Sequence, residues 1–90
     1  MVIRQTTVRN ASGLHARPAS DFVMNAKTFS SKVTIKNLDA NGQAVNAKSI
    51  LRLLAESMTQ GTRVEIAAEG EDEQTAADTL VALIDSGFGE

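Results

Sequence analysis

The spacing of hydrophobic residues changes several times along this chain, and this alternation limits the folds that it can adopt. A period of two is typical of half-buried strands, and a period of about 3.6 is typical of helices with one buried face. Strands are predicted at residues 2–8, 32–36, 43–45 and 62–67, and helices at residues 16–29, 49–56 and from about 73 to 85. The order βαββαβα predicts an α+β fold, in which an antiparallel sheet has helices on one face and solvent on the other.

Individual residues support these elements. The first predicted helix should bury Phe22, Val23 and Ala26. The last one has a similar apolar stripe, formed by Ala77, Leu80, Val81, Ile84 and Phe88. The strongest turn signal is Asn41-Gly42, because this pair readily adopts the positive φ angles of hairpin turns.

The size and composition exclude several classes of protein. Ninety residues suffice for one small domain, so we expect residues 1–90 to form a single unit. The chain has no Cys, which excludes disulfides, thiolate chemistry and cysteine-based metal sites and fits a reducing cytoplasm. No apolar run approaches the roughly 20 residues of a membrane-spanning helix, and residues 1–5 lack a signal-peptide core. We therefore expect no membrane association and a chain that starts at Met1.

Charge is distributed unevenly along the sequence. All nine Lys and Arg residues lie in residues 1–63 with three acids, a local charge of +6 (nine minus three), whereas residues 64–90 contain eight acids and no base. This polarity predicts a basic surface near the only histidine and an acidic surface elsewhere, which favours docking to acidic proteins over nucleic acid. A C-terminal helix whose acids are simply solvated is an equally good interpretation.

The only histidine lies in Gly13-Leu14-His15-Ala16-Arg17-Pro18-Ala19-Ser20, where a predicted strand gives way to a predicted helix. With His15 as the N-cap, the next three residues start the helix, and Pro18 is tolerated because its missing amide would have no intrahelical acceptor. The amides of Ala16 and Arg17 are then free to bind an anion, assisted by the helix dipole and the Arg17 guanidinium. The arrangement is suited to phosphate.

The residues alone leave two interpretations of His15 open. A neutral imidazole nitrogen has a lone pair that can attack phosphorus, and the free amides and Arg17 would stabilise the resulting phosphohistidine of a carrier. A histidine that merely caps a helix explains the same sequence. A metal site lacks a second His or a Cys to complete its coordination. A Ser-His-Asp triad built from Ser12, Ser20 or Asp21 is weak, because turn and helix-surface chemistry explains those residues.

At this segment the chain resembles the HPr family of histidine-containing phosphocarrier proteins, from the bacterial phosphoenolpyruvate-dependent sugar phosphotransferase system. The resemblance covers essentially the whole length. It is carried by residues 13–19, 29–31, 45–50, 60–62 and 69–73, which occur in the family's order. The two specific motifs are Gly13-Leu14-His15-Ala16-Arg17-Pro18-Ala19 and Val45-Asn46-Ala47-Lys48-Ser49-Ile50.

The resemblance implies an open-faced sandwich with a four-stranded antiparallel sheet and three helices on one face. It also implies that His15 accepts a phosphoryl group, on Nδ1, from phospho-enzyme I and passes it to the IIA domain of a sugar permease. Arg17 assists the transfer, the amides of Ala16 and Arg17 bind the phosphate, and Ser12 and Gly13 shape the active-site loop. By this resemblance the protein is a cytoplasmic carrier in sugar transport, with a transient phosphohistidine, and is not an enzyme.

Ser49 precedes the second predicted helix, where a serine is first of all an N-cap. In Gram-positive relatives the matching serine is phosphorylated by an ATP-dependent HPr kinase/phosphorylase to signal catabolite repression through a transcription factor. The resemblance therefore implies a regulatory phosphosite. The helix that follows carries an exposed docking patch in relatives, which Ile50, Leu51 and Leu54 match here.

The sequence of this second helix leaves the packing of its apolar residues open. Leu51, Leu54 and Met58 follow one helical stripe, whereas Ile50 and Leu53 can fill the core, and core packing alone would also explain the pattern. Where many relatives have Met-Gly and a Met-rich stretch, this chain has residues 51–56, which include an Arg and a Glu near the docking surface. This departure concerns recognition of Ser49 by a kinase more than transfer through His15.

Two other functions fit parts of the sequence. One is a regulatory HPr-like module, acting in a nitrogen-related phosphorelay or beside a transcription factor. Residues 82–90 have some likeness to the nitrogen branch, but Lys48-Ser49 favours the sugar branch. The other is an RNA-binding domain, for which three Phe, no Tyr or Trp and a net charge of −2 provide neither base stacking nor phosphate attraction. We expect a monomer with protein partners and with neither nucleic acid nor a cofactor.

Overall fold

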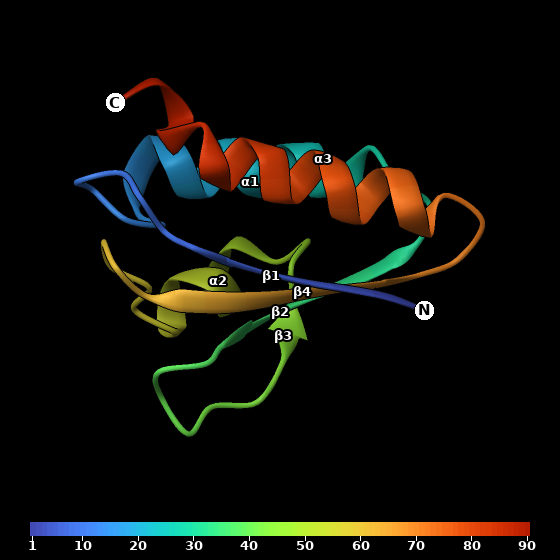
Figure 1. Ribbon diagram of the computed structural model, residues 1–90, viewed down its shortest axis with the longest axis horizontal. Helices are drawn as coiled ribbons and strands as arrows, with labels where there is room; N and C mark the ends of the chain where they lie inside the picture. The colour runs from blue at the N-terminus through green and yellow to red at the C-terminus, as the bar shows by residue number, and fades with distance from the viewer.

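The computed structural model describes residues 1–90 and has one sheet of four antiparallel strands, in the order β1-β4-β2-β3. The elements are β1 (Val2–Thr7), α1 (Ala16–Lys27), β2 (Lys32–Asn37), β3 (Val45–Asn46), α2 (Ile50–Ala55), β4 (Arg63–Glu69), α3 (Glu73–Asp85) and a 3-10 turn, η1 (Gly87–Gly89). Figure 1 shows α1 and α3 together over the same face of the sheet. The predicted α+β class, the order of elements and the open-faced sandwich are confirmed.

One face of the sheet is apolar because alternate residues of its two central strands point toward the helices. Val33 and Ile35 of β2 and Val64 and Ile66 of β4 are buried at this face. The residues between them, such as Thr34, are partly exposed on the opposite face. This alternation separates a dry core from a face that meets solvent.

The helices cover the dry face with the apolar stripes that their spacing predicted. The residues that α1 buries include Phe22, Val23 and Ala26, and those that α3 buries include Ala77, Leu80 and Ile84. Val81, Phe88 and Phe29 are only partly buried against this core, and Phe29 lies beyond α1, which ends two residues before its predicted end. None of the helices is long and apolar enough to cross a membrane.

The connection between β2 and β3 differs from the prediction. Neither Asn41 nor Gly42 has a positive φ, so the pair does not form the predicted hairpin turn. The side-chain oxygen of Asn37 instead accepts two backbone amides just after it, at 2.9 and 3.1 Å, and turns the chain at the end of β2. The loop is consequently longer than a tight hairpin, and β3 comprises Val45–Asn46 rather than residues 43–45.

The unevenly distributed charges meet where the N-terminal segment contacts α3. The ion pairs are the N-terminal ammonium with Glu73 at 3.0 Å, Arg4 with Asp78 at 3.3 Å and Arg9 with Asp85 at 3.7 Å. The hydrogen bond from the ammonium lowers the pKa of Glu73. The three acids of α3 therefore pair with cations at the start of the chain while their side chains stay partly exposed.

Candidate functional site

His15 lies at the junction between the loop after β1 and helix α1. Its backbone is extended, with φ −132° and ψ 165°, and its carbonyl oxygen accepts the amide of Ala19. These are the features predicted for an N-cap residue. The imidazole, however, makes no capping hydrogen bond and is partly exposed. Helix capping by its side chain therefore does not explain the histidine.

The residue after His15 departs from the predicted geometry. Ala16 has a φ of +50°, in the left-handed region, instead of the angles expected for the first residue of a helix. Such a backbone costs an alanine about 1–3 kcal/mol and persists only where the surroundings impose it. The residues on either side provide this constraint, because Leu14 and Pro18 are both buried and fix the two ends of the short exposed segment.

Unpaired hydrogen-bond donors follow His15 at the start of α1. The amides of Ala16 and Arg17 find no acceptor within the protein, as expected in the first turn of a helix. The exposed guanidinium of Arg17 forms no ion pair, whereas Arg4, Arg9 and Arg63 each pair with a carboxylate. Free N–H groups, a free guanidinium and an imidazole at one helix start can together bind a phosphoryl group.

The loop before His15 is anchored on the segment that precedes β4. The amide of the fully buried Leu14 donates to the carbonyl oxygen of Met58 at 2.8 Å. Gly13 has a φ of +68°, and a Cβ there would lie 2.6 Å from the same Met58 oxygen. Glycine is therefore required at this position by both its backbone angle and the contact with Met58. The buried Asn10 adds a hydrogen bond from Nδ2 to the carbonyl oxygen of Gly13 at 2.8 Å.

Ser12, the other residue predicted to shape the loop, is bound by the side chain of Glu90. Its amide donates to Glu90 Oε1 at 3.1 Å, and its hydroxyl donates to Oε2 at 2.8 Å. The amide of Ser12 contributes most to lowering the pKa of Glu90, and the hydroxyl adds to this effect. Because the Ser12 hydroxyl donates to a carboxylate and not to His15, a triad with Ser12 as the nucleophile has no support.

Ser49 caps α2, since its hydroxyl oxygen accepts the amide of Arg52 at 3.3 Å. Within the helix, Leu53 is fully buried as expected. The structure decides the packing that the sequence left open. Ile50 does not fill the core but is exposed by 38%, and Met58 is fully buried although it shares the helical spacing of Leu51 and Leu54.

The exposed apolar side chains of α2 continue onto α1. The exposed fractions of Ile50, Leu51 and Leu54, the three predicted docking residues, are 38%, 78% and 37%. Met24 of α1 is exposed by 64%. A groove of about 190 Å³, called here the α1/α2 groove, is lined by Ser20, Val23, Met24, Lys27 and Ile50. The helix that begins at His15 therefore shares an apolar surface with α2.

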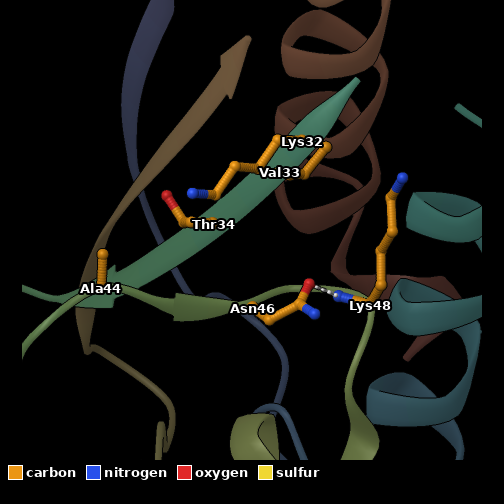
Figure 2. Close-up of a pocket in the computed structure, with 6 residues that line it drawn as sticks. All are labelled: Lys32, Val33, Thr34, Ala44, Asn46 and Lys48. Atoms are coloured by element: carbon orange, nitrogen blue, oxygen red, sulfur yellow. Dashed lines mark hydrogen bonds between the residues drawn. The ribbon is translucent and has the colours of Figure 1, made fainter. Parts of the chain in front are cut away.

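The largest surface cavity does not include His15. It measures about 430 Å³ and is lined by Lys32, Val33, Thr34, Ala44, Asn46 and Lys48 (Figure 2). Within it Asn46 accepts the amide of Lys48, whose Nζ donates to the carbonyl oxygen of Phe29 at 2.8 Å, so this lysine connects β3 to the segment after α1. His15 lines none of the three cavities, and no group of three or more His, Cys, Asp or Glu side chains is placed to hold a metal ion. Any partner must therefore reach the imidazole at the surface.

Three residues at or beside the site were not predicted from the sequence. The Asn10 side chain hydrogen-bonds to Gly13, three positions away, and the Glu90 side chain to Ser12, 78 positions away. No local sequence pattern indicates either contact. The exposure of Met24 could have been predicted from the sequence. The other apolar residues of this helix already form its buried stripe, and Met24 lies outside that stripe.

Known proteins resemble the chain over its whole length. The family described as "PTS HPr component phosphorylation site" matches residues 2–86. The chain is 43% identical over 89 residues to a multiphosphoryl transfer protein of Haemophilus influenzae. This match covers 99% of this chain but only 18% of that protein. It is 43% identical over 86 residues to the phosphocarrier protein HPr of Borreliella burgdorferi, and this match covers 96% of each chain. The structure of HPr-C-His from Thermoanaerobacter tengcongensis matches with a TM-score of 0.93 and 42% identity, over 100% of this chain and 98% of that one.

The matched region includes both specific motifs of the sequence, with His15, Arg17 and Ser49. The relatives are phosphocarrier and phosphoryl transfer proteins by name, which favours a phosphoryl carrier over an RNA-binding domain.

Proposed function

The chain belongs to the HPr family of the phosphotransferase system, and from this premise we propose that residues 1–90 act as one phosphocarrier domain whose acceptor is His15. The observation that carries the proposal is the start of α1, where a histidine without a side-chain capping role is followed by two residues with free amides and an unpaired guanidinium. The phosphoryl group comes from phospho-enzyme I and leaves to the IIA domain of a sugar permease. The protein is restored after each cycle and is a carrier, not an enzyme.

Loading of His15 is a displacement at phosphorus. The lone pair of the imidazole Nδ1 forms an N–P bond while the bond between phosphorus and the donor breaks, and the donor keeps that electron pair. The amides of Ala16 and Arg17 and the Arg17 guanidinium bind the oxygens of the transferred group, whose negative charge they stabilise. Because these donors lie at the surface, water weakens their hold, and the group can be passed on by the reverse displacement.

The partners dock beside the histidine on the apolar surface formed by Ile50, Leu51 and Leu54. A carrier that meets several proteins benefits from one shared non-polar contact. Lys27 lines the α1/α2 groove, Arg17 and Arg52 belong to the same two helices, and none of the three forms an ion pair. They therefore attract acidic partner surfaces and speed encounter. The carrier works in the cytoplasm as a monomer.

Ser49 is the regulatory phosphosite of this proposal. An HPr kinase/phosphorylase transfers the γ-phosphoryl group of ATP to its hydroxyl, and a catabolite-control transcription factor binds the product. Ser49 immediately precedes the docking residues, so a phosphate there adds negative charge to the surface that meets acidic partners and opposes their docking.

Intact-mass measurement tests these roles. After incubation with phosphoenolpyruvate and enzyme I, the wild type should gain one acid-labile phosphoryl group, His15→Ala should gain none, and Arg17→Ala should gain it more slowly. With ATP and the kinase, the wild type should gain an acid-stable group that Ser49→Ala lacks. A folded wild type that gains nothing from an enzyme I active on a control carrier would contradict the assignment of His15.

A further inference from the structure

The loop that presents His15 is bound by the side chain of a residue at the far end of the described chain. Both carboxylate oxygens of Glu90 accept hydrogen bonds from Ser12, and Oε1 also accepts Asn10 Nδ2 at 3.5 Å. We propose that Glu90 is a positioning residue, which holds the turn at residues 10–13 and so presents His15 for phosphoryl transfer. This inference rests on the proposed function of His15 and adds a residue to it.

The backbone before Glu90 is bent so that its side chain returns to the loop. Gly87, Phe88 and Gly89 all have positive φ angles, of 71°, 54° and 81°. Glycine adopts this conformation without strain, but Phe88 does not. The turn is held in place because the Glu90 amide donates to the Gly87 carbonyl oxygen at 3.0 Å and Phe88 packs partly against the core. A strained turn of this kind requires supporting contacts, and the Glu90 carboxylate provides one at its end.

Asn10 connects the carboxylate to the residue two positions before His15. Its Nδ2 donates to both the Gly13 carbonyl oxygen and Glu90, whereas its buried Oδ1 has no partner. A buried acceptor without a partner is unfavourable, so the donor contacts must determine how this side chain is oriented. Hydrogen bonds therefore connect Glu90 to Gly13 through the Asn10 side chain, and removal of the Glu90 carboxylate removes one of the contacts that orient Asn10.

The other anchors hold the two ends of the loop and not Ser12, since the Arg9 carbonyl oxygen accepts Gln60 Nε2 at 2.9 Å at its start. Gly13 and Leu14 are held against Met58, but Ser12 has no other partner than Glu90 for its side chain. Without Glu90, both donors of Ser12 would face water and the turn would move more freely. A carboxylate near the phosphoryl site could instead act through charge repulsion, and this alternative predicts an effect of opposite sign.

The rate of His15 phosphorylation at limiting enzyme I, with phosphoenolpyruvate as donor, separates these effects. Glu90→Ala should slow loading by about three- to tenfold, since small misplacements of a reacting group are costly. Glu90→Gln should keep most of the rate, because an amide can accept from the Ser12 amide and donate to its hydroxyl. Combining Glu90→Ala with Ser12→Ala should be no slower than the slower single variant. Asp78→Asn is the matched control, since this carboxylate binds Arg4 of β1 and Gln74 of α3 and not the loop, and its rate should stay unchanged.

Amide hydrogen exchange provides a second measurement, which does not depend on enzyme I. In Glu90→Ala the Ser12 amide should exchange faster than in the wild type, while amides of β4 keep their protection. Equal loading rates for Glu90→Ala and the wild type, or unchanged exchange at Ser12, would overturn the inference. Faster loading of both Glu90 variants would indicate charge repulsion and would overturn it as well. If Glu90→Ala does not fold, Ser12→Ala replaces it: slower loading than in the wild type supports the inference, and an equal rate overturns it. Faster loading of Glu90→Gln would again indicate charge repulsion. A wild type that is never phosphorylated would refute the proposed function itself, before any variant is compared.

Discussion

Replacement of Gly13 by alanine is expected to destabilise the fold through two separate effects. The first is the backbone conformation, because Gly13 has a φ of +68° and an alanine in the left-handed region costs about 1–2 kcal/mol. The second is steric, because the new Cβ would lie 2.6 Å from the Met58 carbonyl oxygen and 2.8 Å from the Thr59 Cα. Both are backbone atoms that cannot turn away, and overpacking of this kind costs about 1–3 kcal/mol.

The two effects add to about 2–5 kcal/mol for Gly13→Ala. A domain of this length is stabilised by roughly 5–13 kcal/mol in total, so the loss is a large share of its stability. The chain offers a matched control in Gly61, which has a φ of +90° but no atom within 4 Å of a new Cβ. Gly61→Ala should therefore show the backbone effect alone, about 1–2 kcal/mol.

Thermal unfolding followed by circular dichroism measures both variants, because the chain has neither Trp nor Tyr for fluorescence. Each kcal/mol should lower the Tm of a domain of this size by about 4–8 °C. Gly13→Ala should lower the Tm more than Gly61→Ala, by a factor of about 1.5 to 4. Equal shifts for the two variants would refute the steric argument, and with it the conclusion that contact with Met58 makes glycine necessary in the loop.

Two further predictions concern an acid outside the loop and the docking surface. Hydrogen bonds from the Ser31 hydroxyl and then from backbone amides lower the pKa of Asp72 to about 2, below its ordinary value of 3.8. Its stabilising contribution is therefore present above the ordinary value and lost as the pH falls through about 2. The Tm difference between the wild type and Asp72→Asn should shrink over that window, and a constant difference would contradict this explanation. Leu51→Ala should leave the Tm nearly unchanged, because the side chain is 78% exposed, but should slow loading at limiting enzyme I; an unchanged rate would exclude Leu51 from the docking surface.

The order of elements could be predicted because each long element repeats one hydrophobic period. The structure differs from this hydrophobic pattern at two places, where a local backbone or side-chain interaction sets the direction of the chain. At the end of β2 the Asn37 side chain formed the turn, so Asn41-Gly42 was not needed for it. After α2, Ser57 adopts a φ of +50°, so the chain leaves the helical path. Met58 therefore enters the core, although its spacing from Leu51 and Leu54 is that of a continuing helix.

The candidate site divides in a similar way. His15 and Arg17 could be proposed as site residues from the sequence, because their residue types and the adjoining helix start lie within a few positions. The left-handed Ala16 was missed, since its conformation is imposed by the burial of Leu14 and Pro18 and not by its own preference. The contact with Glu90 could not be predicted, because it joins positions 78 apart through a turn whose direction depends on the complete fold.

The arrangement of anchors and open donors explains how a site of this kind can both accept and release a charged group. The loop is fixed from the protein side, through Leu14 and Gly13 on Met58, so the backbone of the histidine is held although its imidazole makes no capping hydrogen bond. On the solvent side, the amides of Ala16 and Arg17 are unpaired at little cost, because water satisfies them between transfers. A closed pocket would strengthen every hydrogen bond to the phosphoryl group by lowering the local dielectric constant, and the group would then be harder to pass on. An exposed site on a fixed loop therefore suits transfer in both directions better than a deeper one.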